Sequence, residues 1–352
     1  MGDNVIWFRP PRSLLGFLAE KNFKGLFGSL FKNPALERIE LLKDVEILCF
    51  RPRGVYPLPQ HLLPRNILIT LKRNFLKQIE FLPKLDFILL GWAVFQEEIQ
   101  LLRTLFPQAK IILDVPDDIP SFYVNNIFLQ NSFFETLREV DGVVSINKGI
   151  LEKYQRWIKV PSTVIPNGVS FGDPPGFAIK NARIKILGYF GAFDFWFDFK
   201  SLQTLASKLP DFQFFLAGPC TRSCIPELKE ALKLTNIKYF GALPFSEIPD
   251  FLKKIDLLII PWLQTEISLM ADPIKIKEAL YAGLPVISFF PTGDPKIDSK
   301  IVITKDLDEI ANVCQKPFLQ DLLTRKKWAD EISKEFPWTK QLKKLREFCQ
   351  SL

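Results

Sequence analysis

Histidine is almost absent from this chain, because its 352 residues include only one, His61. A single histidine excludes most catalytic and metal-binding sites that are built on imidazole. Cysteine is also scarce: the five cysteines are scattered, and Cys220 and Cys224 have no second pair that would complete a zinc site. The expected state is therefore a set of reduced thiols in a cytosolic protein.

Long apolar runs are missing as well. The run Leu85–Phe95 is shorter than the roughly 18 residues of a membrane span, and the charged and polar start of the chain does not indicate a cleavable signal peptide. With 47% apolar and 24% charged residues, the composition excludes disorder. The length predicts two domains, and we expect a cytoplasmic protein.

Short apolar segments alternate with amphipathic ones along most of the sequence. Continuous apolar strands between amphipathic helices are typical of parallel sheets covered on both faces. The sequence therefore predicts an α/β fold with two doubly wound, Rossmann-like domains that face a central cleft. The expected strands are 45–50, 87–90, 111–115, 142–146, 184–190, 212–217, 237–240, 257–260, 286–289 and 301–304. The expected helices are 95–105, 128–140, 200–208, 227–234, 246–254, 273–282 and 307–314.

A linker separates the two halves. Residues 160–183 include four prolines and three glycines and show no clear periodicity. The predicted division is a first domain over 1–160, a hinge over 161–183, a second domain over 184–330 and a final helical segment over 331–352. Ligands of open α/β sheets bind beyond the carboxyl ends of the strands, so the hinge would place both ligand-binding edges on one cleft.

The strongest local signal is the segment Ala271–Ser288. Asp272 is suited to cap a helix and Gly283 to end it. The free N–H groups at such a helix start form an anion site, most naturally for phosphate. Lys275 lies where it could pair with a diphosphate, and Glu278 where it could accept hydrogens from two ribose hydroxyls. The alternative is a surface helix with solvated charges.

Two glycine turns add to this signal. Gly188–Trp196 closes the first strand of the second half, and Leu216–Pro219 closes the next strand. Glycine at a strand end lets the backbone approach a ligand closely. Neither turn is a full GxGxxG motif, so a dinucleotide site is only weakly indicated and ordinary turns remain an alternative.

The order of these motifs resembles the nucleotide-sugar-binding domain of GT-B glycosyltransferases. Among these enzymes it is similar to the family-4 type, nearest to teichuronic-acid-type and cell-surface polysaccharide transferases. The resemblance is clear over 160–350 and thinner in the first half, where it depends on 113–118 and 143–147. The motifs of the second half are 165–169, 188–192, 214–219, 237–241, 249–252, 256–261 and 271–288.

The resemblance implies roles for individual residues. Glu278 would hold the donor ribose, the backbone at Ala271 and Asp272 would bind the donor phosphates, and Gly191 would face the diphosphate across the cleft. Lys275 stands at a position that is often basic in this subgroup. The remaining donor-binding residues implied by the resemblance are Ala192, Gly218, Phe240, Gly241 and Leu243. It also implies that the segment 331–352 crosses back to the first, acceptor-side domain.

The sequence departs from the family pattern at two places. Met270 stands where the family commonly has a glutamate that contacts the transferred sugar, and Glu266 would have to substitute for it. The usual Arg/Lys pair after the first glycine turn is missing. Neutralisation of the diphosphate would then fall to Lys275, Lys277, Arg222 or Lys200.

On the acceptor side, Asp117 and Asp118 follow the strand 111–115 and are the predicted contacts to the acceptor. With Asp114 they resemble the metal-binding motif of the other glycosyltransferase fold, but the donor motifs lie in the second half, so neither metal nor cofactor is expected. His61 matches no family motif and is expected at the surface.

The formal net charge of +7 has two interpretations. Residues 13–32 carry a helical stripe of phenylalanine and leucine flanked by lysines. This stripe would either pack into the first domain or rest on anionic lipid as a peripheral membrane contact. Nucleic-acid binding is not expected, because the lysines are spread along the chain without a recognition motif.

The leading functional hypothesis is a metal-independent glycosyltransferase, of hexosyltransferase type. It would move a sugar from a nucleoside diphosphate sugar to a glycan or lipid-linked acceptor, in cell-surface polysaccharide synthesis and with retention. A nucleotide-sugar epimerase and a non-catalytic binding or scaffold subunit are the alternatives. Met270 and the missing basic pair favour the scaffold, whereas the scarcity of acid–base side chains weighs against the epimerase.

Overall fold

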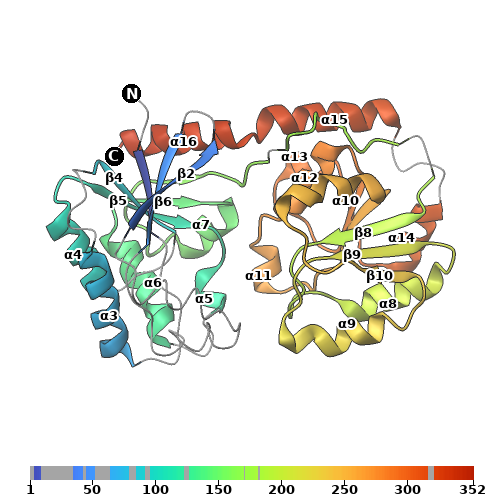
Figure 1. Cartoon of the computed structure of the whole chain (residues 1–352), viewed down its shortest axis with the longest axis horizontal. Coiled ribbons are helices and arrows are strands. Elements are labelled where there is room, and N and C mark those ends of the chain that lie inside the picture. Colours follow the sequence, from blue (N-terminus) through green and yellow to red (C-terminus); the bar gives the residue numbers. More distant parts are fainter. Residues whose placement is uncertain are drawn as a thin grey trace.

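The computed structural model describes two α/β domains that lie side by side (Figure 1). The residues described are 4–8, 35–42, 45–51, 64–78, 85–91, 96–122, 127–169, 171–180, 183–315 and 321–352. The predicted lipid-facing stretch 13–32 and His61 lie outside the described residues. Across these ranges, no helix combines the length and the apolarity needed to cross a bilayer.

The first domain contains a four-stranded parallel sheet in the order β4-β5-β6-β7. Its strands are β4 (Phe87–Leu90), β5 (Lys110–Val115), β6 (Gly142–Ser145) and β7 (Ser162–Val164). The helices are α3 (Arg65–Lys77), α4 (Gln96–Leu105), α5 (Ile119–Phe122), α6 (Ile127–Glu139) and α7 (Lys148–Tyr154). A separate three-stranded sheet, in the order β1-β3-β2, comprises β1 (Asn4–Phe8), β2 (Ala35–Leu42) and β3 (Val45–Arg51).

Strand β7 lies inside the segment that the sequence assigns to the linker. It pairs with β6 through Val143 and Ser162, Val144 and Thr163, and Ser145 and Val164. The first domain therefore extends into the predicted hinge, and the crossing between domains begins after Val164.

The second domain contains a six-stranded sheet in the order β10-β9-β8-β11-β12-β13. Counted within the domain, this order is 3-2-1-4-5-6, the arrangement of doubly wound nucleotide-binding sheets. Every pair in it is parallel, which confirms the predicted fold class. The strands are β8 (Ile186–Phe190), β9 (Gln213–Ala217), β10 (Ile237–Tyr239), β11 (Leu257–Ile260), β12 (Val286–Ser288) and β13 (Val302–Ile303).

The apolar composition of the strands explains their position. All four residues of β11 are buried, because helices cover both faces of a central parallel strand. The helices are α8 (Phe199–Lys208), α9 (Ile225–Ala231), α10 (Ile248–Lys254), α11 (Glu266–Leu269), α12 (Ile274–Ala282), α13 (Pro295–Asp298) and α14 (Leu307–Gln315), with short 3₁₀ turns η2 (Arg222–Cys224) and η3 (Phe245–Glu247). The strand order reverses between β8 and β11, and this is where such sheets bind their ligands.

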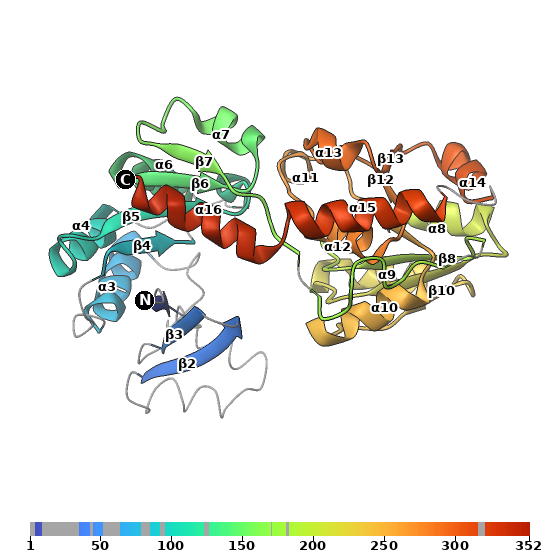
Figure 2. The same cartoon turned by 90° about the horizontal axis from the view of Figure 1, so that it is seen from above.

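Two terminal helices connect the domains. Helix α15 (Leu322–Glu335) packs against α12, and α16 (Trp338–Gln350) lies over the first domain (Figure 2). Cys349 of α16 joins a buried cluster with Ile112 and Val144 of the first sheet. The chain therefore returns to the first domain at Pro337, between the two helices.

Asn236 joins three segments of the second domain. Its Nδ2 lies 3.0, 3.2 and 3.1 Å from the carbonyl oxygens of Ala206, Leu209 and Phe212. Asn236→Leu removes this buried donor, although the carbonyl of Leu209 still accepts from the amide of Phe212, so we expect the free energy of unfolding to fall by about 1–3 kcal/mol. Urea denaturation measures the loss. The exposed Asn312→Leu is the control, and equal stability of the two variants would contradict the assignment.

Candidate functional site

Three glycine turns line the carboxyl ends of β8, β9 and β10. The amide of Gly191 donates to the carbonyl of Ala217 at 2.9 Å, and that of Gly218 donates to the carbonyl of Gly241 at 2.7 Å. Gly191 and Gly218 have φ angles of +133° and +140°. A Cβ atom on Gly218 would stand 1.9 Å from the carbonyl oxygen of Gly191. Gly218 is therefore packed so closely against the backbone of Gly191 that only glycine fits there.

Helix α12 begins opposite these turns. Its N-cap is Pro273, with no side-chain cap hydrogen bond. The expectation that Asp272 caps the helix is therefore wrong, whereas the predicted end at Gly283 is confirmed by its left-handed backbone, with φ of +81°. The amide of Ile276 donates to the carbonyl of Pro273 at 2.9 Å, so without a side-chain cap the N–H groups of Ile274 and Lys275 are those available to an anion.

Asp272 is instead part of a buried ion pair. Its two carboxylate oxygens lie 2.7 and 2.6 Å from Nζ of Lys277, and Oδ2 also accepts from the amide of Asn167 at 2.9 Å. The Lys277 ammonium, 2% exposed, donates to the carbonyl of Asn167 as well. Lys277 is thereby committed to the turn and is not available to neutralise a diphosphate.

Lys275 is the basic group that lies beside the glycine turns. Its Nζ lies 4.7 Å from the ring centroid of Trp262, and a Cβ atom on Gly191 would stand 2.5 Å from its Cε. Burial lowers the pKa of Lys275 to about 8, against the opposing effect of Glu278 and Asp117. A desolvated ammonium next to free backbone N–H groups is suited to bind phosphate oxygens.

Glu278 follows Lys275 on the same helix. It is 5% exposed, and burial raises its pKa to about 7, while Lys275 acts in the opposite direction. The carboxylate lies close enough to Lys275 for the two charges to interact, one helical turn deeper than the free N–H groups.

The remaining predicted donor residues lie along the same edge of the sheet. The carbonyl of Ala192 accepts from the Tyr189 hydroxyl at 3.0 Å. Phe240 is 41% exposed, with its ring 5.1 Å from that of Phe215, and the neighbouring Gly241 and Leu243 continue this wall. Ala271 is buried, directly before the Asp272 turn.

The two predicted acceptor residues occupy different environments. Asp117 faces the second domain, since Lys275 and Asp272 both influence its pKa, which burial raises to about 6. The side chain of Asp118 is fully buried and lies 2.7 Å from Nζ of Lys153. It also accepts hydrogen bonds from the hydroxyls of Ser121 and Tyr154. Asp118 therefore has no free surface, and Asp117 alone is placed to face the cleft.

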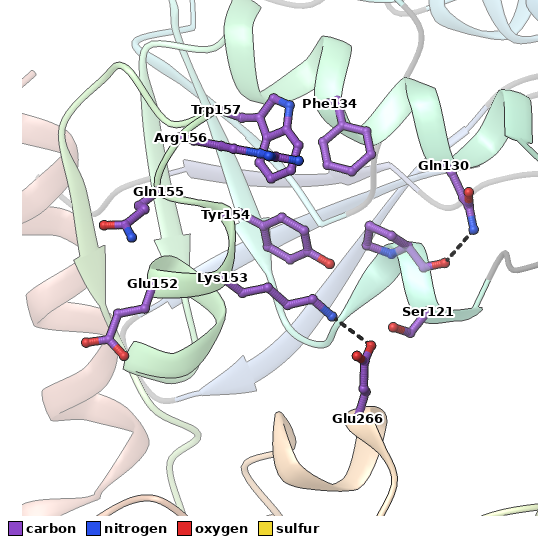
Figure 3. Close-up of a pocket in the computed structure, with 11 residues that line it drawn as sticks. Ser121, Gln130, Phe134, Glu152, Lys153, Tyr154, Gln155, Arg156, Trp157 and Glu266 are labelled. Carbon is purple, nitrogen blue, oxygen red and sulfur yellow. Dashed lines mark hydrogen bonds and ion pairs between the residues drawn. The ribbon is translucent and has the colours of Figure 1, made fainter.

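Helix α7 contacts α11 across the cleft. Nδ2 of Asn147 donates to the carbonyl of Met270 at 2.5 Å, and a Cβ atom on Gly149 would lie 3.2 Å from the Met270 sulfur. Lys153 reaches Glu266 at 3.1 Å (Figure 3). Met270 and Glu266, the two positions where the family pattern is in question, thus both contact the first domain.

A groove of about 560 Å³ opens beside this contact. It is formed by α5, α6 and α7 with the chain that follows α7, and Glu266 of the second domain closes one side (Figure 3). Its residues from Lys153 to Trp157 were not singled out from the sequence, because they are distant from every glycine turn and no spacing marks them.

Comparison with known proteins identifies the second domain. Residues 185–316 match the family model described as glycosyl transferases group 1. The second domain is a group 1 glycosyltransferase domain. Over 102 residues the chain is 31% identical to the Bacillus subtilis (strain 168) protein named "Putative teichuronic acid biosynthesis glycosyltransferase TuaH". This match covers 29% of the present chain and spans about a quarter (26%) of the length of TuaH.

Solved structures share the whole fold at low sequence identity. Sucrose-phosphate synthase from Thermosynechococcus elongatus is 14% identical, with a TM-score of 0.69 over 99% of this chain and 98% of the other. Anabaena HepE, in complex with UDP and glucose, is 14% identical, with a TM-score of 0.64 over 88% and 87% of the two chains. The group 1 domain therefore belongs to a two-domain GT-B fold.

Lys153 pairs with two carboxylates that differ in burial. The exposed fraction of the side chain is 0% for Asp118 and 76% for Glu266. Lys153→Met leaves a buried carboxylate without its cation, so we expect a loss of about 2–3 kcal/mol in the free energy of unfolding. Glu266→Gln breaks only the exposed pair and should cost less than about 1 kcal/mol. Chemical denaturation compares the two, and equal losses would be incompatible with a structural role for Asp118.

The raised pKa of Glu278 predicts a pH dependence of stability. The folded chain holds this proton more tightly than the unfolded chain, whose pKa is near 4.5. The protonated Glu278 therefore contributes its full stabilisation below about pH 4.5, and this stabilisation is lost as the pH rises through about 7. By linkage the loss is on the order of 3 kcal/mol.

Glu278→Gln removes this titration but keeps the side-chain volume. As the pH rises from about 5 to 8, we expect the free energy of unfolding of wild type to fall relative to that of the variant. Urea unfolding at several pH values measures it. Burial also raises the pKa values of Asp114 and Asp117. These two residues titrate in both proteins, so their effects on the unfolding free energy largely cancel in the difference. A constant difference across this range would refute the assignment.

Proposed function

We propose that the protein is a glycosyltransferase that moves a sugar from a nucleoside diphosphate sugar to a glycan or a lipid-linked acceptor. The observation that carries this proposal is that Lys275 lies between Gly191 and the start of α12, which has no side-chain cap. We call this place the slot. The slot offers backbone N–H groups, a helix dipole and an ammonium to a diphosphate. Glu278, one turn further along α12, offers its carboxylate to the ribose hydroxyls.

The comparisons support this assignment of the slot. The family match covers the slot residues, since 185–316 includes Gly191, Lys275 and Glu278. Structures of Anabaena HepE contain UDP, UDP and glucose, or UDP-glucose, and a structure of a mutant of S. aureus TarM contains UDP with alpha-GlcNAc-glycerol and fondaparinux. By analogy, we propose UDP as the first nucleotide to test.

In the proposed reaction, the bond between the sugar and the diphosphate breaks and negative charge develops on the leaving phosphate. The start of α12 and Lys275 stabilise that charge without a metal ion. Asp117 faces the slot from the acceptor side. Cell-surface polysaccharide synthesis as the biological role and retention at the anomeric carbon are part of the proposal, while membrane contact through residues 13–32 stays a prediction from the sequence.

A non-catalytic binding subunit is the second candidate. Met270 replaces the acidic residue expected near the transferred sugar, and it packs against Gly149 of the first domain. Release of UDP from a panel of UDP-sugars distinguishes the two: a transferase releases UDP when an acceptor is supplied, whereas a binding subunit is stabilised by UDP but releases none.

Glu278→Ala tests the donor site directly. It removes a charged acceptor of two hydrogen bonds, so we expect UDP affinity to fall at least tenfold and sugar transfer to be nearly lost. Calorimetry measures the affinity, and the ligand-induced rise in melting temperature gives an independent reading. Glu230→Ala, on the exposed surface of the same domain, is the control. Unchanged UDP affinity in Glu278→Ala would overturn the assignment.

A further inference from the structure

The groove beside α7 contains an arginine that stacks on a tryptophan ring. The guanidinium carbon of Arg156 lies 3.7 Å from the ring centroid of Trp157, and the Trp157 ring lies 4.6 Å from that of Phe134 (Figure 3). Stacking occupies the face of the guanidinium and leaves its N–H donors free along the edge. The arginine is thus oriented before any ligand arrives.

The other charges of the groove already have partners. Glu152 pairs with Lys148 at 2.8 Å, and Glu266 shares Lys153 with Asp118. Arg156 is exposed, and in the part of the chain that the structure describes, no carboxylate lies within ion-pair distance of it. Among the described residues that line the groove, Arg156 is therefore the cation whose donors remain available to an incoming anion.

The rest of the lining suits a hydroxylated ligand. Gln130 brings an amide group into the groove, and Ser121 brings a hydroxyl that donates to Asp118 and can still accept. Nε2 of Gln130 donates to the carbonyl of Pro120 at 3.4 Å, which leaves its carbonyl oxygen to accept from a ligand. Besides the paired charges of Glu152, Lys153 and Glu266, the groove thus offers neutral polar groups and the free donors of Arg156, which suits a sugar chain that carries an acidic group.

The groove also has a defined distance from the cleft. Asn147, at the start of α7, contacts Met270 of the second domain, and Arg156 follows nine residues later. The seven residues of α7 (Lys148–Tyr154) account for roughly 10 Å of this separation, which is longer than one hexose ring. A ligand that reaches both points must contain more than one sugar unit.

We propose that this groove binds an extended acceptor glycan, and that Arg156 pairs with a carboxylate or phosphate on that glycan, beyond the sugar unit that reacts. This inference rests on the proposed transferase function and specifies its acceptor. The acceptor is an acidic oligosaccharide or a lipid-linked glycan whose anionic group lies outside the reaction centre.

Calorimetry with three soluble probes tests the proposal on the full chain. The probes are tetragalacturonate, which carries carboxylates, maltotetraose with a phosphate at its reducing end, and neutral maltotetraose. We expect wild type to bind at least one anionic probe about tenfold more tightly than maltotetraose, since a bidentate arginine pair supplies that difference. The two anionic probes distinguish a carboxylate from a phosphate.

Arg156→Gln should weaken binding of the preferred anionic probe about tenfold and leave maltotetraose unchanged. Arg156→Lys keeps the charge but loses the fork and the stack, so it should recover only part of the affinity. Equal affinity of wild type for all three probes, or anionic binding that Arg156→Gln does not alter, would overturn the proposal.

UDP-dependent stabilisation separates this test from that of the donor site. Arg156 lies outside the slot between Gly191 and α12, so the rise in melting temperature with UDP should be equal in wild type and both variants. If UDP does not raise the melting temperature of wild type, the proposed function is contradicted. If UDP does raise it but wild type shows no preference for the anionic glycans, only the assignment of the groove is contradicted.

Discussion

The buried ion pair between Asp272 and Lys277 holds the start of α12 in place. The pair ties the turn before α12 to the backbone of Asn167, which belongs to the segment between the domains. A buried ion pair is stable only when further hydrogen bonds satisfy both partners, and here Asn167 supplies an amide donor and a carbonyl acceptor. The start of α12 is therefore positioned by the interdomain segment as well as by its own domain.

Burial perturbs the three ionisable groups that lie around the slot. Burial raises the pKa values of Glu278 and Asp117 and lowers that of Lys275, which means that each group would be better solvated in water. Perturbed groups of this kind cluster where a ligand replaces the lost water. In the proposed transferase the diphosphate would pair with Lys275, whereas the ribose hydroxyls would donate hydrogen bonds to Glu278.

The sequence predicts the second domain well and the first domain less completely. Apolar runs such as Leu257–Ile260 and the end of α12 at Gly283 follow from local rules, because burial and a left-handed glycine leave few alternatives. The role of Asp272 does not follow from them: capping is a local preference, and a buried lysine five residues later outweighed it. Strand β7 was hidden by the prolines around it, since its pairing with β6 depends on the tertiary structure. Arg156 and Trp157 are neighbours in the sequence, but the packing of Trp157 against Phe134 of α6 depends on the tertiary structure and no spacing reveals it.

The chain crosses between the domains twice, and the two crossings touch. The amide of Val169 donates to the carbonyl of Phe336 at 2.7 Å, and a Cβ atom on Gly168 would stand 2.7 Å from Cδ2 of Trp338. Two adjacent connecting segments resist twisting and sliding of one domain against the other more than a single linker does. The two crossings therefore fasten the domains to each other along one short line of contact beside Gly168. A change in the relative position of the domains would also have to break the contacts of Asn147 with Met270 and of Lys153 with Glu266.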